Sequence, residues 1–175
     1  SGDSTQTAEL ANVGFKIPTL AEIKMQSNGF RGPLGNGVSF NKNIPTSWNV
    51  GAGTNIKWKV KVPKKGYNSP VIWGDKLFLS GADNAERWLY CYDRSTGKLL
   101  WQHQANSITG SPATAPKTTD DTGLAAPTVT TDGNVVVALF GTGDMVACDF
   151  TGKRVWAKNL GVPNNHYGHS SSLIY

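Results

Sequence analysis

Two histidines near the end of the chain have the side chains best suited to chemistry. His166 and His169 stand three residues apart in the stretch HYGH, a spacing at which two imidazoles could bind one metal ion. A metal site needs further ligands, and none lies nearby in the sequence, so we assign no metal ligands. Three interpretations stay open: a metal site, a polar lining at the mouth of an opening in the fold, and plain loop packing.

The two cysteines could supply thiols for a disulfide or for metal binding. Cys91 stands two residues before Asp93, whereas Cys148 stands one residue before Asp149. Because successive side chains of a strand point to opposite faces, this difference turns the two thiols to opposite faces of equivalent strands. No metal-ligand spacing surrounds either cysteine. We therefore expect two buried thiols that act as small hydrophobic side chains.

A repeated pattern indicates which elements position these residues. The stretches YCYDRSTGKLLWQ at 90–102 and ACDFTGKRVWA at 147–157 share an Asp, a Thr-Gly-Lys turn and a Trp, and their glycines are 55 residues apart. Each unit holds four short apolar runs, at 70–73, 76–80, 87–92 and 98–103 and then at 127–131, 134–140, 144–149 and 153–158. A period near 50 residues with four short strands per unit predicts an all-β fold, a β-propeller of four-stranded antiparallel blades. About two complete blades are present.

The residues shared by the two copies have structural roles in such a fold. An Asp that ends a strand can accept a hydrogen bond from the backbone two residues on, and a Gly with positive φ lets the chain reverse into the outer strand. A Trp on the outer strand can then cover the contact between neighbouring blades. We assign these roles to Trp58, Asp93, Gly97, Trp101, Asp149, Gly152 and Trp156.

The chain divides into three parts. Residues 1–29 are interpreted as a polar N-terminal tether, in which a capping box at Thr19 and Glu22 predicts a short helix to about Met25. Residues 30–54 form an extension that leads into the propeller. The partial propeller comprises 55–175, with an outer strand at 55–62, blades at about 69–104 and 126–158, and the start of another blade at 169–175.

A closed ring needs roughly four to eight blades. We therefore expect the remaining blades of a longer chain, or other copies of this chain, to complete the ring. The outer strand 55–62 alternates apolar residues with Lys57, Lys59 and Lys61, which is typical of a half-buried strand with a charged outer face.

Charge and hydropathy exclude several classes of function. The net charge is +5 and the pI is near 9.3, but the lysines are spread over predicted strand faces and turns, which favours solvated edges and no nucleic-acid partner. No apolar run approaches the roughly 20 residues of a membrane-spanning helix, so we expect no transmembrane segment. The polar start SGDSTQTAEL lacks an initiator Met, as expected of a processed, exported protein.

One face of the predicted propeller gathers the candidate binding residues. Connections from outer to inner strands share a face and converge on the central channel, and long loops on a rigid scaffold often bind ligands. The connection at 104–124 carries an insertion, which is either a binding loop or a flexible decoration. The candidates for a protein or glycan ligand at this channel mouth are Asn68, Asp120, Asp121, His166 and His169.

The repeats also resemble a known family. Asp93, Thr96, Gly97 and Trp101 match the tryptophan-docking motif of the quinoprotein-like β-propellers, and the second copy matches with one residue fewer in its turn. The segment RGPLGNGVS at 31–39 resembles the N-terminal segment of a bacterial subgroup named for pyrroloquinoline-quinone (PQQ)-like repeats. The resemblance implies a periplasmic or cell-envelope protein, with a membrane tether at the N-terminus as one option.

The resemblance leaves the activity open between two classes. Members of the family include scaffolding proteins, so we expect a binding or scaffolding module. The alternative is a PQQ-dependent or related oxidoreductase whose active residues lie in blades outside this sequence. Such an enzyme would bind PQQ with calcium and would need a catalytic Asp, oxygen ligands for the cation and often a vicinal Cys pair. None of these can be assigned here, and the catalytic residues stay unknown.

Overall fold

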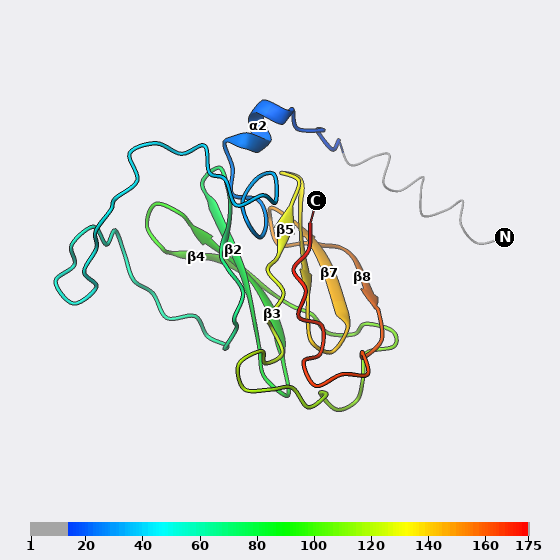
Figure 1. The fold of residues 1–175 in the computed structure, drawn as a ribbon. Coiled ribbons are helices and arrows are strands. Elements are labelled where there is room, and N and C mark those ends of the chain that lie inside the picture. The colour runs from blue at the N-terminus through cyan, green and yellow to red at the C-terminus, as the bar shows by residue number, and fades with distance from the viewer. Residues whose placement is uncertain (1–13, 175) are drawn as a thin grey trace.

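The computed structural model describes residues 14–174 and contains two four-stranded antiparallel sheets (Figure 1). Each sheet is a meander in which neighbours in sequence are neighbours in space. Sheet 1 comprises β1 (Val71–Trp73), β2 (Lys76–Ala82), β3 (Arg87–Asp93) and β4 (Leu99–Gln104). Sheet 2 comprises β5 (Thr130–Thr131), β6 (Val135–Leu139), β7 (Asp144–Asp149) and β8 (Arg154–Asn159). The predicted all-β fold with two antiparallel blades is therefore confirmed.

Both sheets have an irregularity at the same place between the third and fourth strands. The register shifts between Cys91 and Tyr92 in sheet 1, and between Ala147 and Cys148 in sheet 2. Cys91 is paired with Trp101, while the equivalent partner of Trp156 is Ala147. Cys148 is therefore one position further along its strand than Cys91, and alternation places the two thiols on opposite faces of equivalent strands.

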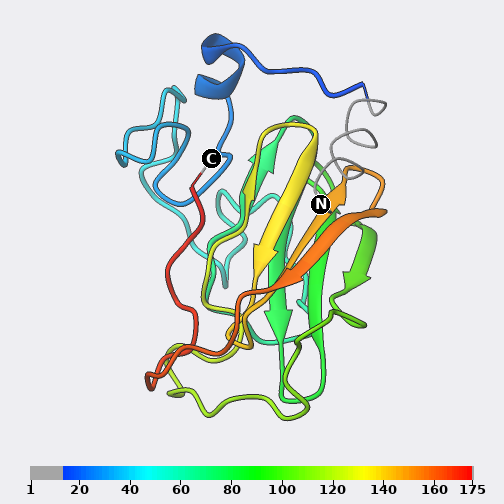
Figure 2. The same ribbon diagram turned by 90° about the vertical axis from the view of Figure 1, so that its right-hand side faces the viewer.

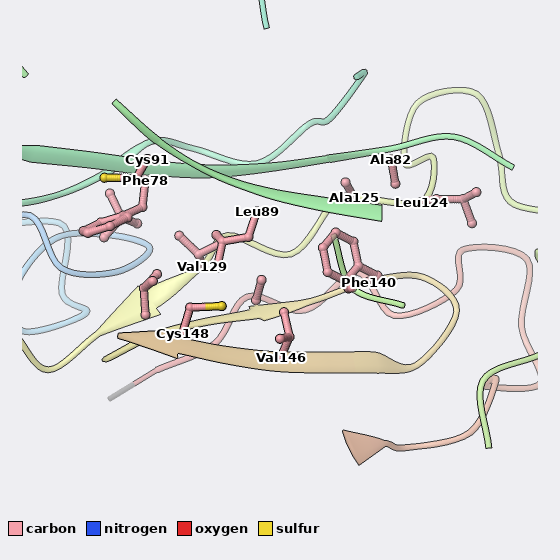
Figure 3. Close-up of a cluster of buried hydrophobic side chains, with 14 of the residues drawn as sticks. Phe78, Ala82, Leu89, Cys91, Leu124, Ala125, Val129, Phe140, Val146 and Cys148 are labelled. Atoms are coloured by element: carbon pink, nitrogen blue, oxygen red, sulfur yellow. The ribbon is translucent and has the colours of Figure 1, made fainter. Parts of the chain in front are cut away.

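The core lies between the two sheets (Figure 3). Phe78, Leu89 and Cys91 enter it from sheet 1, and Val146 and Cys148 enter it from sheet 2. Opposite faces of equivalent strands thus meet in one interface, and both thiols are free and fully buried there. Burial raises the pKa of each thiol to about 12, so both remain protonated and behave as apolar side chains.

Two segments that were expected to form strands lie outside the sheets. Residues 55–62 and 169–174 contain no strand, and residue 175 lies outside the described range. A strand needs a hydrogen-bonded neighbour, and neither segment has a ladder partner within 14–174. The first strand of sheet 2 is also shorter than the run predicted at 127–131, because only Thr130–Thr131 pairs with β6.

The N-terminal arm contacts both sheets. The capping box of Thr19 and Glu22 is present, and helix α2 spans Leu20–Lys24 with Met25 as its C-cap. Ser27 then forms an antiparallel bridge with Ile72, and the backbone oxygen of Asn28 accepts a hydrogen bond from Thr131 N at 3.0 Å. Residues 14–29 therefore differ from the expected tether, because backbone bonds attach their end to the first strands of both sheets. Residues 1–13 lie outside the described range.

Candidate functional site

The two ends of the sheets carry different structures (Figures 1 and 2). We call the end with α2 and residue 174 the helix end, and the opposite end, with 66–68, 104–124 and 160–168, the loop end. The sequence-based candidates Asn68, Asp120, Asp121 and His166 belong to the connections of the loop end, and His169 directly follows the last of them. No helix within the described part of the chain is long and apolar enough to cross a membrane.

The Asn68 side chain links two segments of the loop end through hydrogen bonds. Its Nδ2 donates to the backbone oxygens of Ser80 and Ala125, both at 2.8 Å, and its Oδ1 accepts from Ser80 N at 3.1 Å. The amide thus connects β2 of sheet 1 to the end of the insertion that leads into sheet 2. Both amide hydrogens are used within the fold, so Asn68 shapes the face and has no free donor for a ligand.

The turn around Asp120 is tied to two other connections. The hydroxyl of Tyr67 donates to the backbone oxygen of Asp120 at 2.6 Å, and Thr119 N donates to the backbone oxygen of His166 at 3.1 Å. The ammonium of Lys65 lies 4.9 Å from the centre of the Tyr67 ring. The structure therefore brings Asp120 and His166 into one neighbourhood, with Tyr67 beside them.

The carboxylates and imidazoles of this face differ in solvent exposure and in hydrogen bonding. Asp120, Asp121 and His166 are exposed, and a hydrogen bond from the Thr119 side chain lowers the pKa of Asp121. His169 is half-buried, with its Nε2 2.8 Å from the backbone oxygen of Gly161. Within residues 14–174 no three His, Cys, Asp or Glu side chains are grouped to hold a metal ion. Among the five sequence-based candidates, the exposed ionisable side chains are therefore those of Asp120, Asp121 and His166.

Sequence reasoning missed a buried carboxylate that supports the same face. Asp144 is fully buried and accepts hydrogen bonds from Ser111 Oγ at 2.9 Å and Asn159 Nδ2 at 2.8 Å. Arg87 Nε lies 2.9 Å from Asp144 Oδ2, at an angle that makes an ion pair and no hydrogen bond. The cluster joins both sheets to the insertion through Ser111. Arg87 and Asp144 each begin the third strand of their sheet, but this shared position does not indicate in the sequence that they pair.

The predicted tryptophans lie over glycines of neighbouring turns. Trp58 Nε1 donates to Arg94 O at 2.9 Å, and a Cβ added at Gly97 would lie 2.7 Å from the Trp58 ring. Trp101 Nε1 donates to Phe150 O at 3.0 Å, and a Cβ at Gly152 would lie 2.8 Å from the Trp101 ring.

Trp156 is the third residue of this type, and its surroundings differ. It lies on β8, and its side chain is exposed. The sequence assigned it the same role as Trp58 and Trp101, but the described chain places no further turn against it.

The helix end holds an apolar pocket. Its volume is about 340 Å³, which is at the lower limit of small-molecule sites. It lies between α2, the glycine-rich loop that follows, β5 and the last described residues. Its lining is Leu20, Ile23, Asn28, Gly29, Phe30, Gly32, Pro33, Leu34, Gly35, Thr130, Leu173 and Ile174. None of the sequence-based candidates lines it.

Comparison with known proteins found similarity to parts of longer solved structures. No curated protein matches. Among solved structures, BamB from Moraxella catarrhalis is 20% identical with a TM-score of 0.41, covering 61% of this chain and 27% of its own. A europium-containing methanol dehydrogenase is 18% identical with a TM-score of 0.43, and the match covers 58% of this chain and 18% of the dehydrogenase. The quinohemoprotein alcohol dehydrogenase from Comamonas testosteroni is 20% identical with a TM-score of 0.38, and the match covers 58% of this chain and 14% of that enzyme.

The chain thus spans 27% or less of the length of these proteins. The family assignment comes from the sequence itself. The profile of the PQQ-like repeat family described as outer membrane protein assembly factor BamB matches residues 48–171. This match covers well over half of the chain, which therefore belongs to that family.

Proposed function

We propose that this chain is part of an exported bacterial β-propeller that acts as a binding or scaffolding module, with its ligand contacts at the loop end. The observation that carries the proposal is the attachment of three separate connections to one another. Asn68 bonds to Ala125, Tyr67 bonds to Asp120, and Thr119 bonds to His166. Loops held in place on rigid sheets lose little entropy on binding and so suit recognition.

The family description favours a protein as the ligand. Because the matching family is described as an assembly factor for outer membrane proteins, we propose a cell-envelope location and an assembly role for this chain. The exposed carboxylates of Asp120 and Asp121 and the imidazole of His166 supply polar contacts at the edge of such an interface. The remaining blades of the ring, from a longer chain or from other copies, would extend the surface.

The tryptophans have a supporting role in this proposal. Trp58 and Trp101 would fix neighbouring blades against one another through the indole hydrogen bond and the contact with glycine. Such docking keeps the sheets, and with them the loop end, in one relative position. Substitution of either tryptophan is therefore expected to harm folding before it harms binding.

The test uses an outer-membrane β-barrel protein, diluted from urea, as the probe. We expect the protein to bind this probe and slow its aggregation, measured by light scattering. The triple variant Asp120→Ala, Asp121→Ala, His166→Ala should weaken binding, since all three side chains are exposed at the loop end. The matched control is Ile17→Ala with Met25→Ala, two exposed side chains beside α2. Equal binding by the triple variant and the parent would overturn the assignment of this face.

The alternative, a quinone-dependent oxidoreductase, is tested in the same series. Titration of the protein with PQQ and calcium would show quinone absorbance changes if a cofactor site is present. Within this chain, Cys91 and Cys148 are far apart in sequence and both are buried in the core with raised pKa values, so they do not form a vicinal pair. Saturable PQQ binding would favour the enzyme over the scaffold.

A further inference from the structure

A polar contact between the two sheets lies beside the docked Trp101. Trp101 and His103 are two residues apart on β4 and therefore lie on the same side of that strand. Trp101 lies over Gly152, and two residues after that glycine Arg154 Nε donates a hydrogen bond to His103 Nε2 at 3.1 Å. Both sheets have all four of their strands in this chain. The contact is therefore an interior feature of two neighbouring blades and belongs to no open edge.

The hydrogen bond between Arg154 and His103 requires a neutral imidazole. A guanidinium only donates, so His103 Nε2 accepts with its lone pair and the ring proton is on Nδ1. Burial lowers the pKa of His103, and the charge of Arg154 lowers it further, while a hydrogen bond with the backbone of Gly152 offsets part of both effects. The fold thus favours the form of the ring that can accept the bond.

The elements packed against His103 leave Arg154 as the charged side chain that acts on its pKa. On β3, Arg87 is paired with the buried carboxylate of Asp144. On β7, the cross-strand partner of Arg154 is Cys148, and burial raises the pKa of that thiol to about 12, so it is neutral. The turn before β8 carries a carboxylate and an ammonium that act on each other, those of Asp149 and Lys153.

Arg154 also binds the first residues of the insertion at 104–124. Its Nη2 donates to the backbone oxygen of Gln104 at 3.0 Å and to Asn106 Oδ1 at 3.3 Å. Ala105 between them is buried, and its N donates to a backbone oxygen of β3 at 2.9 Å. One guanidinium on sheet 2 therefore bonds both to the outer strand of sheet 1 and to the start of the insertion.

We propose that His103 and Arg154 form a pH-sensitive contact between the two blades, in which protonation of His103 releases Arg154 and loosens the start of the insertion. A protonated ring has no lone pair left to accept the bond. The guanidinium stays charged, so two positive charges would then face each other at hydrogen-bonding distance in a half-buried site, where they repel. Moving the guanidinium away also breaks its bonds to Gln104 and Asn106.

The direction of the effect follows from the lowered pKa of His103. Between the ordinary value of 6.5 and the lowered value, the unfolded chain binds a proton at His103 and the folded chain does not. The contact therefore contributes its full stability above pH 6.5, and this stability is lost as the pH falls below that value. Neither residue is among the candidate ligand contacts, so this device and the proposed function fail independently.

The test is an NMR titration of the His103 ring in the parent and in two charge variants. Arg154→Gln removes the guanidinium, and Lys153→Gln is the matched control, because it removes an exposed positive charge one residue earlier and has the same net charge. A third variant, His103→Gln, retains an acceptor for Arg154 but takes up no proton. The Arg154 Nε–H signal and the hydrogen-exchange protection of the Ala105 amide, corrected for intrinsic exchange at each pH, report the release.

We expect the His103 ring to titrate below 6.5 in the parent and in Lys153→Gln, with an upward shift in Arg154→Gln. As His103 becomes protonated in the parent, the Arg154 Nε–H signal should disappear and the protection of the Ala105 amide should fall, whereas both should persist in His103→Gln. A midpoint at or above 6.5 in the parent, an equal shift in the two charge variants, or the same loss of protection in the parent and His103→Gln would overturn the proposal. The parent titration decides even if a variant fails to fold.

Discussion

Trp101 and Trp58 make the same contact with a neighbouring turn, but only one of them belongs to a sheet. Trp101 lies on β4, whose backbone pairs with β3, and its ring centre is 6.0 Å from that of Phe78 in the core. Trp58 lies in a segment that has no strand partner within residues 14–174, and its indole bonds to Arg94 O.

The contact between indole and turn therefore does not depend on sheet pairing. What both sites share is a glycine beneath the ring, with a φ of 74° at Gly97 and 90° at Gly152. These values lie in the region that side chains other than glycine rarely adopt. The spacing of Gly and Trp therefore encodes the contact locally, whereas the surrounding sheet determines how much stability depends on it.

The largest expected effect is that of Trp101→Ala. Loss of a large aromatic side chain that packs against the core should lower the free energy of unfolding by about 3–5 kcal/mol. Trp58→Ala should cost less, about 1–2 kcal/mol, because its segment has no ladder to lose. Urea unfolding followed by circular dichroism measures both. Equal losses would show that the two contacts contribute alike and that sheet pairing adds nothing.

The second effect concerns the glycines beneath the rings. Gly97→Ala and Gly152→Ala should each destabilise by about 1–3 kcal/mol, because the new Cβ would meet the indole at under 3 Å and the backbone is strained. Gly161→Ala is the matched control, since its φ is 80° but a Cβ there has no atom within 4 Å. The difference between Gly152→Ala and the control isolates the contact with Trp101. A difference of zero would mean that backbone strain alone explains the cost.

The same contrast explains what sequence could and could not predict. The spacing of Gly97 and Trp101, repeated at Gly152, together with four short apolar runs in each unit, predicted two four-stranded sheets, because both signals are local in the sequence. Alternation at 55–62 predicted a strand, but alternation reports only two unlike sides, and pairing needs a neighbour. The contact between Arg87 and Asp144 was missed because it joins residues from two sheets, and no local pattern encodes how sheets stack.

The loop end shows the same limit. The sequence placed Asn68 and the insertion on one face, but it could not show that the Asn68 amide is used up by Ser80 and Ala125. The role of Tyr67 was also missed, because an exposed Tyr in a loop has no periodic signal. Hydrogen bonds between distant loops depend on the final fold, which composition and spacing do not specify.

The third effect concerns pH and the turn below Trp58. Hydrogen bonds from the Ser95 and Thr96 side chains, together with those from their backbone amides, lower the pKa of Asp93 to about 2. A carboxylate with a lowered pKa contributes stability that is present above its unfolded value of about 3.8 and is lost as the pH falls towards 2. The urea midpoint of Asp93→Asn should therefore be below that of the parent at pH 6, with the gap closing near pH 2. A gap that is the same at both pH values would contradict this cause.

Asp149 in the equivalent turn is the natural comparison. Its pKa is also lowered, although partial burial works against the hydrogen bonds from Thr151 and Lys153. Asp149→Asn should show the same sign of pH dependence. Because burial offsets part of the hydrogen bonding, we expect its gap to change less between pH 6 and pH 2 than that of Asp93→Asn.

The smallest effect is that of Lys59→Ala, and it tests whether an exposed lysine beside Trp58 has a role within the folded chain itself. Lys59 is exposed, and no ion pair within residues 14–174 includes it. Its loss should therefore change the free energy of unfolding by less than about 0.5 kcal/mol, although Trp58 beside it matters for stability. The same urea series measures this value. A loss as large as that of Trp58→Ala would mean that the Lys59 side chain is paired inside the fold.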